Sequence, residues 1–282
     1  MERFCFIISY GNLPFHNLGK GLGDRMMILV ILMAGFILRI VNLDQSFWLD
    51  EAISALAAKN YSFIGILTDF IKGDTHPPLY YLLLKLWASY FGYSEVSLRF
   101  LSILFGIATV YIVYLIAKKY FNPKNALFIA LLFATAPLHI YYSQEVRMYS
   151  LSTLLVSLAF YFFIKKSWKI FSVILLLIGI TDYIPLLIIP VFWIYLIRNS
   201  SYKNNLKKFF LSHIPLGIFL IIWSEVFLLQ SRGSSSYLEI FPSWGNLLGR
   251  ADIKQLLLLG VKFIIGRISF EPKTLYAVVT II

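Results

Sequence analysis

The chain has 282 residues, of which 59% are hydrophobic and only 14% are charged. Soluble domains usually carry about a quarter charged residues, so this composition excludes an ordinary soluble globular protein. The apolar residues fall into blocks separated by short polar stretches, which is the spacing of membrane spans rather than of one large core. The sequence therefore predicts an all-α, polytopic bundle of transmembrane helices.

The formal net charge is +11. In a soluble protein this excess of Lys and Arg would indicate a nucleic-acid partner. Here the basic residues form short clusters between apolar blocks, as they do in cytoplasmic loops, and we expect no nucleic acid. The single cysteine, Cys5, excludes an intrachain disulfide and a zinc site of the Cys/His type.

The predicted elements begin after residues 1–25, which lack a clear cleavage site and are interpreted as a cytoplasmic N-terminal segment that need not hold the native start. Met26–Leu43 is the first predicted span, and a large outer loop over residues 44–96 follows it. Within that loop, Leu79–Phe91 is apolar but short, and Lys85 interrupts it. We predict that this helix lies flat in the membrane interface, with Lys85 reaching toward water.

The orientation of the later elements depends on this flat helix. The further predicted spans are Val96–Ala117, Ala126–Tyr141, Met148–Ile164 and Phe209–Leu229, with a tight helical pair, Ile170–Thr181 and Ile184–Ile197, around Asp182. The basic clusters at 118–124, 165–169 and 198–208, which contain no acidic residue, then all face the cytoplasm. If Leu79–Phe91 crossed the membrane, all three clusters would face outward.

The C-terminal part is predicted to differ from the core. We assign residues 26–230 to the transmembrane core, and residues 231–282 to an outer loop and the start of a further, truncated span. Within this last segment, Gln255–Ile268 is a short apolar block with basic residues and is predicted to be a second interfacial helix.

Two carboxylates in the outer loop are candidates for chemistry. Asp50 and Glu51 follow an aromatic and apolar run in the segment FWLDEA. A carboxylate beside bulky apolar groups at a membrane surface can serve as a general base. Alternatively, Asp50 caps a short helix, AISALAAKN, with Glu51 in its first turn.

His76 and Arg99 are further candidates, each with a structural alternative. His76 precedes two prolines that fix an extended turn, and it can bind a ligand, shuttle a proton or bond a phosphate, although the same pattern marks a helix start. Arg99 lies near the start of a predicted span. There it either faces an anion or partner through its planar donor fork or extends to the surface.

The turn SQEVRMY between two predicted spans holds Glu145, Arg147 and Tyr149. Glu145 and Arg147 are able to pair with each other at the surface, and Tyr149 fits an interfacial aromatic belt. The predicted topology places this turn at the same membrane level as the candidates of the outer loop, so we expect all of them to converge.

The segments FWLDEA, HPPLYYLLL, SLRFLSILFG and HIYYSQEVRMYSL, in this order, resemble the membrane glycosyltransferases of the GT-C class. Within that class the chain is similar to the dolichyl-phosphate-mannose–protein mannosyltransferases and the aminoarabinose transferases. The resemblance covers roughly residues 26–165, and beyond about residue 170 the similarity is only one of hydropathy. It implies a GT-C-like bundle with interfacial helices in its first outer loop, located in the plasma membrane with the active site on the extracytoplasmic face.

The activity implied by this resemblance is transfer of a sugar from a polyprenyl-phosphate-linked donor to a hydroxyl of a protein, lipid or glycan acceptor, with inversion. Asp50 would be the catalytic base and Glu51 its partner. The residues assigned to donor phosphate or substrate binding are His76, Arg99, Glu145, Arg147, Tyr149, Lys262 and Arg267. A divalent metal, Mg²⁺ or Mn²⁺, held by Asp50, Glu51 and Glu145 is an alternative means of stabilising phosphate charge.

Two other functions stay open. The first is a polytopic lipid or glycan transporter, which predicts ionisable residues deep in spans or interrupted spans. The charges here lie mostly near predicted span ends. The second is a catalytically inactive membrane scaffold derived from an enzyme, which would keep its cellular role after Asp50→Ala.

The chain also departs from the pattern of the family that it resembles. Relatives are usually longer, and some carry a lysine in the segment where this chain has His76.

Overall fold

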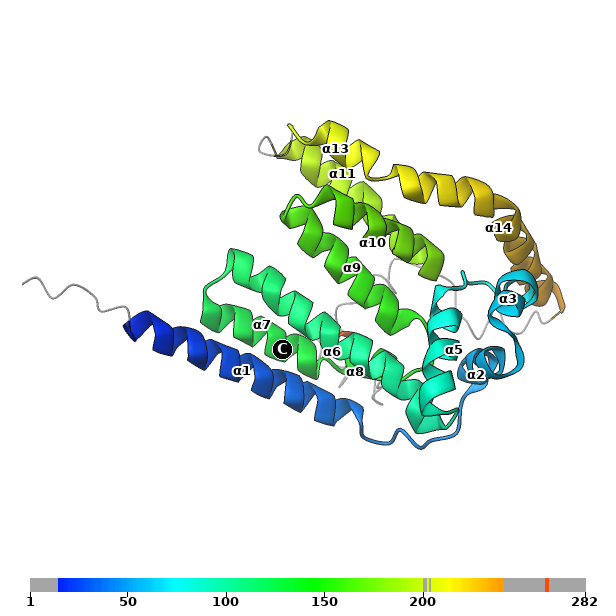
Figure 1. Ribbon diagram of the computed structural model, residues 1–282, viewed down its shortest axis with the longest axis horizontal. Coiled ribbons are helices and arrows are strands. Elements are labelled where there is room, and N and C mark those ends of the chain that lie inside the picture. Colours follow the sequence, from blue (N-terminus) through cyan, green and yellow to red (C-terminus); the bar gives the residue numbers. More distant parts are fainter. Residues whose placement is uncertain (1–14, 200–201, 203, 241–261, 264–282) are drawn as a thin grey trace, which may run out of the picture.

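The computed structural model describes residues 15–199, 202, 204–240 and 262–263, and this part of the chain is built from helices (Figure 1). The elements are α1 (Phe15–Arg39), α2 (Leu49–Asn60), α3 (Phe63–Gly65), the π-helical turn η1 (Ile66–Phe70), α4 (Ile71–Gly73), α5 (Leu79–Phe91), α6 (Glu95–Tyr120), α7 (Pro123–Thr135), α8 (Pro137–Ser143), α9 (Tyr149–Ile164), α10 (Trp168–Thr181), the 3₁₀ turn η2 (Ile184–Ile188), α11 (Ile189–Arg198), α13 (Leu206–Leu211) and α14 (Ile214–Ile240).

Among the described residues, two helical runs are long and apolar enough to cross a membrane: Glu95–Tyr120, and Leu206–Arg232 from α13 and α14. The pair α7 and α8 passes the same test, although the two helices are bent by 58°. The helices α9, α10 and η2–α11 are apolar but shorter. By length and composition the structure therefore supports two or three spans, fewer than the sequence predicts.

The bend between α7 and α8 breaks the predicted span Ala126–Tyr141. It falls before Pro137, which has no N–H for the helix ladder and pushes the preceding residue out of the helical region. Ala136 accordingly has φ −61° and ψ 116°. Arg39 of α1 donates a hydrogen bond to the carbonyl of Ala134 at 2.9 Å, so a carbonyl beside the break is satisfied without water.

The two ends of the bundle differ. The turns from α6 to α7 and from α9 to α10 lie at one end, whereas α2, α3 and α5 lie at the other (Figure 1). Helix α5 lies across the bundle helices and has the predicted bounds Leu79–Phe91. Its Lys85 is half-buried, and its ammonium donates to the carbonyl of Ala58 at 3.1 Å, which ties α5 to α2.

Two apolar clusters hold these elements together. The larger one runs from α2 and α5 through α6, α9 and α10 to α14, and its fully buried members include Leu84, Leu98 and Phe171. The smaller one joins α1, α6 and α7, where Ala126 and Ala130 let the helix backbones approach closely. The large cluster anchors the outer-loop helices on the bundle, so side chains on α2 and α5 have a rigid support.

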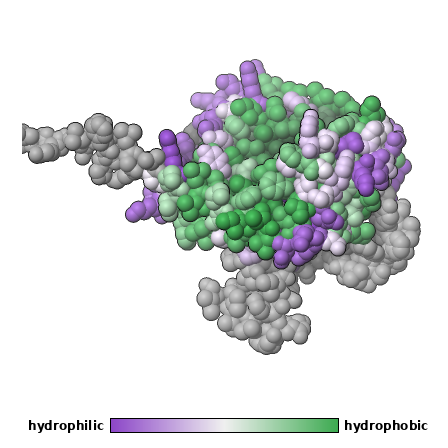
Figure 2. All heavy atoms as spheres, turned by 60° about the horizontal axis from the view of Figure 1, so that its bottom comes forward, coloured by the Kyte–Doolittle hydropathy of each residue, from purple (hydrophilic) through white to green (hydrophobic). Residues whose placement is uncertain are grey.

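The outer surface is apolar over a broad area. The face shown in Figure 2 is hydrophobic across its middle, with hydrophilic residues gathered toward its margins. Exposed apolar side chains include Leu187 (74% exposed) and Ile221 (75% exposed). Water disfavours so large an apolar surface, whereas the hydrocarbon of a bilayer matches it.

Candidate functional site

Helix α2 carries both predicted catalytic carboxylates in its first turn. It begins at Leu49 with Trp48 at the N-cap position, so the alternative in which Asp50 is the cap is wrong. Negative charge in a first turn is favoured by the helix dipole. The two side chains differ in environment, since Glu51 is 2% exposed whereas Asp50 is half-buried.

Glu51 forms a two-bonded ion pair with Arg99 of α6. Its Oε1 accepts from Nε of Arg99 at 2.9 Å, and its Oε2 accepts from Nη2 at 2.6 Å. The backbone N–H of Val146 donates to Oε1 at 3.0 Å, and that of Trp48 donates to Oε2 at 3.4 Å. One carboxylate therefore joins α2, α6 and the turn between α8 and α9.

The remaining N–H groups of Arg99 donate hydrogen bonds to the loop between α1 and α2. Its Nη1 donates to the carbonyls of Leu43 at 2.6 Å and Gln45 at 2.5 Å, and its Nη2 donates to that of Ser46 at 3.4 Å. Every nitrogen of this guanidinium is thus engaged. A donor phosphate, the predicted partner of Arg99, would have to displace one of these bonds, so the geometry favours a positioning role for Arg99.

A cavity of about 480 Å³ opens beside this ion pair. Its wall includes Trp48, Tyr141, Gln144 and Glu145 together with the pair itself. Gln144 donates to the carbonyls of Arg39 at 3.0 Å and Val41 at 2.8 Å, which closes the end of α1. Glu145 and Glu51 therefore line the same cavity, one from the turn and the other from α2.

Arg147 is the centre of a second polar cluster and is 5% exposed. Its Nη1 donates to the hydroxyl of Tyr81 at 3.3 Å and that of Ser54 at 3.5 Å, and its Nη2 lies 3.3 Å from Nδ1 of His76. The guanidinium also lies over the ring of Tyr149, 6.0 Å from its centroid. Its Nε–H is buried without a hydrogen-bond partner among the described residues.

Asp74 holds His76 and Tyr81 in this cluster. Its Oδ1 accepts the backbone N–H of His76 at 2.8 Å and lies 3.0 Å from Nδ1 of that ring, while its Oδ2 accepts the hydroxyl of Tyr81 at 3.0 Å. Burial alone would raise the pKa of Asp74. The hydrogen bonds and charge of His76, and the charge of Arg147, outweigh burial and hold that pKa below its ordinary value.

Asp50 belongs to the same electrostatic environment. Burial alone would lower the pKa of Arg147, but Tyr81, Tyr149, Asp74 and Asp50 outweigh it, so the pKa of Arg147 is raised. No described residue donates a hydrogen bond to the carboxylate of Asp50, which is half-buried at the edge of the cluster. Its oxygens are therefore available to a bound molecule.

The structure brings three further predicted site residues together around Arg147: Asp50, His76 and Tyr149. The sequence analysis assigned no role to three other members of this cluster: Ser54, Asp74 and Tyr81. Asp74 had a signal, since it stands two residues before His76. The other two had none, because serine and tyrosine are ordinary residues at a membrane interface.

The C-terminal candidates are less fully placed. Phe263, the neighbour of Lys262, contacts Phe133 of α7 with ring centroids 5.6 Å apart. Arg267 and the interfacial helix predicted over Gln255–Ile268, apart from residues 262–263, lie outside the described residues. Their assignment to substrate binding stays a prediction.

The predicted carboxylate set does not fit a metal ion in this arrangement. Within the described part of the chain, no three His, Cys, Asp or Glu side chains converge on one point. Glu51 also uses both oxygens on Arg99 and on backbone N–H groups, which leaves it a poor ligand. Dependence on Mg²⁺ or Mn²⁺ stays a prediction.

These features define a helical membrane protein with a buried arginine–carboxylate site at one end of its bundle. Residues 75–228 match the family described as dolichyl-phosphate-mannose-protein mannosyltransferase, and the chain belongs to this family of membrane glycosyltransferases. The match continues well past residue 170, so the predicted C-terminal limit of the resemblance was too early. It begins after Asp50, so the segment FWLDEA lies outside it.

One relative is an uncharacterized protein of Aquifex aeolicus (strain VF5). It is 30% identical to this chain over 154 residues, which cover 51% of this chain and 31% of the relative. The chain therefore matches about a third of the length of that protein. No solved structure matches the chain.

Proposed function

We propose that this chain transfers a sugar from a polyprenyl-phosphate-linked donor to an acceptor hydroxyl at the extracytoplasmic face of the plasma membrane, with inversion. The observation that carries the proposal is the cluster around Arg147: a buried guanidinium whose Nε–H has no hydrogen-bond partner among the described residues, in the same electrostatic environment as the half-buried carboxylate of Asp50, which accepts no hydrogen bond from a described residue. Membership of a family of membrane glycosyltransferases supports the reaction class.

In this mechanism Asp50 accepts the proton of the acceptor hydroxyl while the hydroxyl oxygen forms a bond to the anomeric carbon. The bond from that carbon to the phosphate oxygen breaks on the opposite face, and the polyprenyl phosphate leaves with the electron pair. Arg147 stabilises the charge that grows on the phosphate, because a positioned guanidinium is most effective in a water-poor site.

The two carboxylates therefore have different roles. Glu51 is a positioning residue, since its bonds to Arg99 and Val146 fix the first turn of α2 and with it the backbone of Asp50. Asp74 positions His76 and Tyr81 against Arg147. Arg99 is assigned here to the same supporting framework rather than to the donor phosphate.

The test is transfer of radiolabelled sugar in membranes that contain the chain, with a panel of polyprenyl-phosphate-sugar donors. Asp50→Asn should reduce transfer by about 10²–10⁴-fold, the usual contribution of a general base. The matched control is Asp44→Asn, an exposed carboxylate of the same loop. Equal transfer by wild type and Asp50→Asn would remove Asp50 from the chemistry.

A lipid or glycan transporter is the second candidate, and one observation favours it. The chain has an interrupted helix, α7–α8, and the buried Arg39 approaches His139 of α8 at 2.6 Å beside the break. Discontinuous helices of this kind form binding sites in transporters. Scrambling of a fluorescent polyprenyl-phosphate lipid in vesicles that contain Asp50→Asn would separate the two, because only a transporter keeps its activity in that variant.

A further inference from the structure

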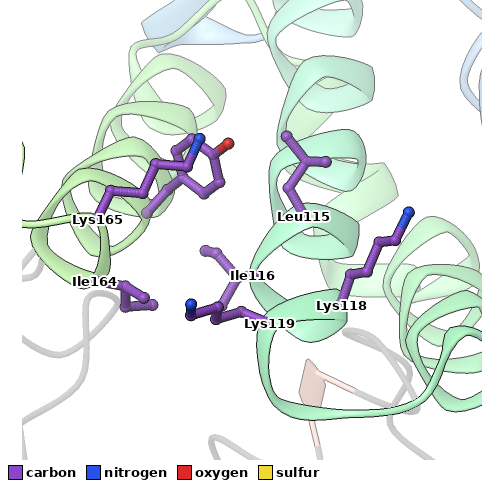
Figure 3. Close-up of a pocket in the computed structure, with 7 residues that line it drawn as sticks. Leu115, Ile116, Lys118, Lys119, Ile164 and Lys165 are labelled. Atoms are coloured by element: carbon purple, nitrogen blue, oxygen red, sulfur yellow. The ribbon is translucent and has the colours of Figure 1, made fainter.

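A cleft lies between the C-terminal ends of α6 and α9, in a region that the proposed reaction does not use. Its volume is about 250 Å³. The apolar part of its lining comes from Leu115, Ile116 and Ile164, and the remainder includes lysines of both helices. Figure 3 shows the two helices side by side with these residues around the gap.

The charge of this cleft is entirely positive. Lys119 of α6 and Lys165, which follows α9, extend into the gap from opposite sides (Figure 3), and Lys165 lies over the ring of Tyr161, 4.4 Å from its centroid. Lys118 lines the cleft with its stem, but its ammonium extends away from the gap toward Tyr114. No acidic residue is among the lining side chains.

The cleft lies at the end of α6 opposite to the candidate active site. Helix α6 carries Arg99 near its first turn and Lys119 in its last turn. At 1.5 Å per residue, the helix separates these positions by about 30 Å, the thickness of a bilayer's hydrocarbon core. A cation pair over an apolar floor therefore lies where lipid headgroups meet acyl chains.

Topology explains part of this arrangement. Lysines are favoured at helix C-termini by the dipole and in cytoplasmic loops by the positive-inside rule. Neither effect requires two lysines from different helices to share one hollow with apolar walls. We propose that the cleft binds the phosphate headgroup of an anionic phospholipid of that leaflet, with Lys119 and Lys165 on the phosphate and an acyl chain along Leu115 and Ile116.

The experiment is native mass spectrometry of the purified full chain in detergent, titrated with dioleoyl-phosphatidylglycerol and, separately, with dioleoyl-phosphatidylcholine. The cleft variant is K119Q/K165Q. The matched control, K124Q/K169Q, removes two exposed lysines of the same end that do not line the cleft. The cleft variant should bind phosphatidylglycerol about tenfold more weakly or worse, and the control should stay within about twofold of wild type.

The variant K119R/K165R keeps the charge and should retain binding, which separates loss of the site from loss of folding. Equal loss in K119Q/K165Q and K124Q/K169Q would overturn the proposal, since general electrostatic attraction would then suffice. Equal binding of phosphatidylcholine would also overturn it. So would full displacement of the lipid by inorganic phosphate, because a simple anion site would then explain the charge.

Discussion

Two arginines at the same end of the bundle, Arg99 and Arg147, illustrate opposite uses of the same side chain. Arg99 has a hydrogen-bond acceptor for every nitrogen, and its carboxylate partner, Glu51, is equally occupied. Arg147 is as deeply buried, but its Nε–H has no described partner, and its Nη1 makes only long contacts with hydroxyl groups, 3.5 Å to Ser54 and 3.3 Å to Tyr81.

Whether all its donors are occupied distinguishes a buried arginine that supports the fold from one that binds substrate, and it does so better than burial or charge. A saturated buried ion pair has no capacity left for a substrate, and breaking it leaves an uncompensated charge. An unsaturated guanidinium costs free energy in the empty protein, and a phosphate that completes its hydrogen bonds recovers that free energy. We therefore expect substitutions at Arg99 to affect folding first and substitutions at Arg147 to affect donor binding first.

The largest expected effect follows from breaking the saturated pair. Arg99→Ala should destabilise the protein by about 3–5 kcal/mol, because Glu51 is left buried and unpaired. Thermal or denaturant unfolding in detergent measures this loss. Arg99→Lys keeps the charge but loses the planar set of donors, so its free energy of unfolding should lie between those of wild type and Arg99→Ala. A stability unchanged in Arg99→Ala, combined with a loss of donor binding, would reverse the roles assigned to the two arginines.

The second prediction concerns the unsaturated arginine. Arg147→Lys keeps a cation in the site but loses the planar donors, so the KM for the polyprenyl-phosphate donor should rise by about 10–100-fold, corresponding to about 1.5–3 kcal/mol. Its free energy of unfolding should change by less than that of Arg99→Lys. The measurement is the KM for the donor beside a melting curve. A fall in kcat at unchanged KM would place Arg147 away from the donor phosphate in the ground state.

The contrast between the arginines also shows what the sequence can and cannot predict. Local patterns correctly predicted Leu79–Phe91 as a helix, because its apolar run is bounded by Pro78 and Gly92. The break at Pro137 was missed because the apolar run continues through it, although the proline was a visible signal. The ion pair between Arg99 and Glu51 was not predicted. The two residues are 48 positions apart, and their pairing depends on tertiary packing that no sequence spacing reveals.

The third prediction concerns the pH dependence of stability that Asp74, in the cluster around Arg147, contributes. Asp74 has a folded-state pKa below its ordinary value of 3.8, so it contributes stability that is fully present above that value. The contribution is lost as the pH falls below about 4 and through the folded-state pKa. Asp74→Asn should therefore cost about 1–3 kcal/mol at neutral pH and reduce the acid-induced loss of stability.

Unfolding measured in detergent between pH 3 and pH 7 tests this prediction. Asp69→Asn is the control, since Asp69 is exposed and its bond to Thr68 is local. If Asp74→Asn and wild type lost stability in parallel on acidification, another carboxylate would be responsible for the acid sensitivity.

The smallest expected effect concerns hydrogen bonds that connect the cluster around Arg147 to the more distant helix α14. Gln230 of α14 donates to the carbonyls of Ile71 at 2.8 Å and His76 at 3.2 Å, and accepts the hydroxyl of Tyr183 at 2.6 Å. Tyr183 in turn accepts from the indole of Trp223 at 2.9 Å. This chain of bonds ties the backbone of His76 to the second half of the bundle.

Tyr183→Phe removes one member of this chain and leaves the packing of its ring intact. Because the hydroxyl both donates to Gln230 and accepts from Trp223, the change should reduce stability by about 2 kcal/mol, the net value of two hydrogen bonds, and change the KM for the donor by less than about threefold. The control is Tyr90→Phe, at a side chain that is 77% exposed. If Tyr183→Phe impaired donor binding as strongly as Arg147→Lys, the position of His76 would depend on the distant helices. The unsaturated cluster would then be one part of a larger site that reaches α14.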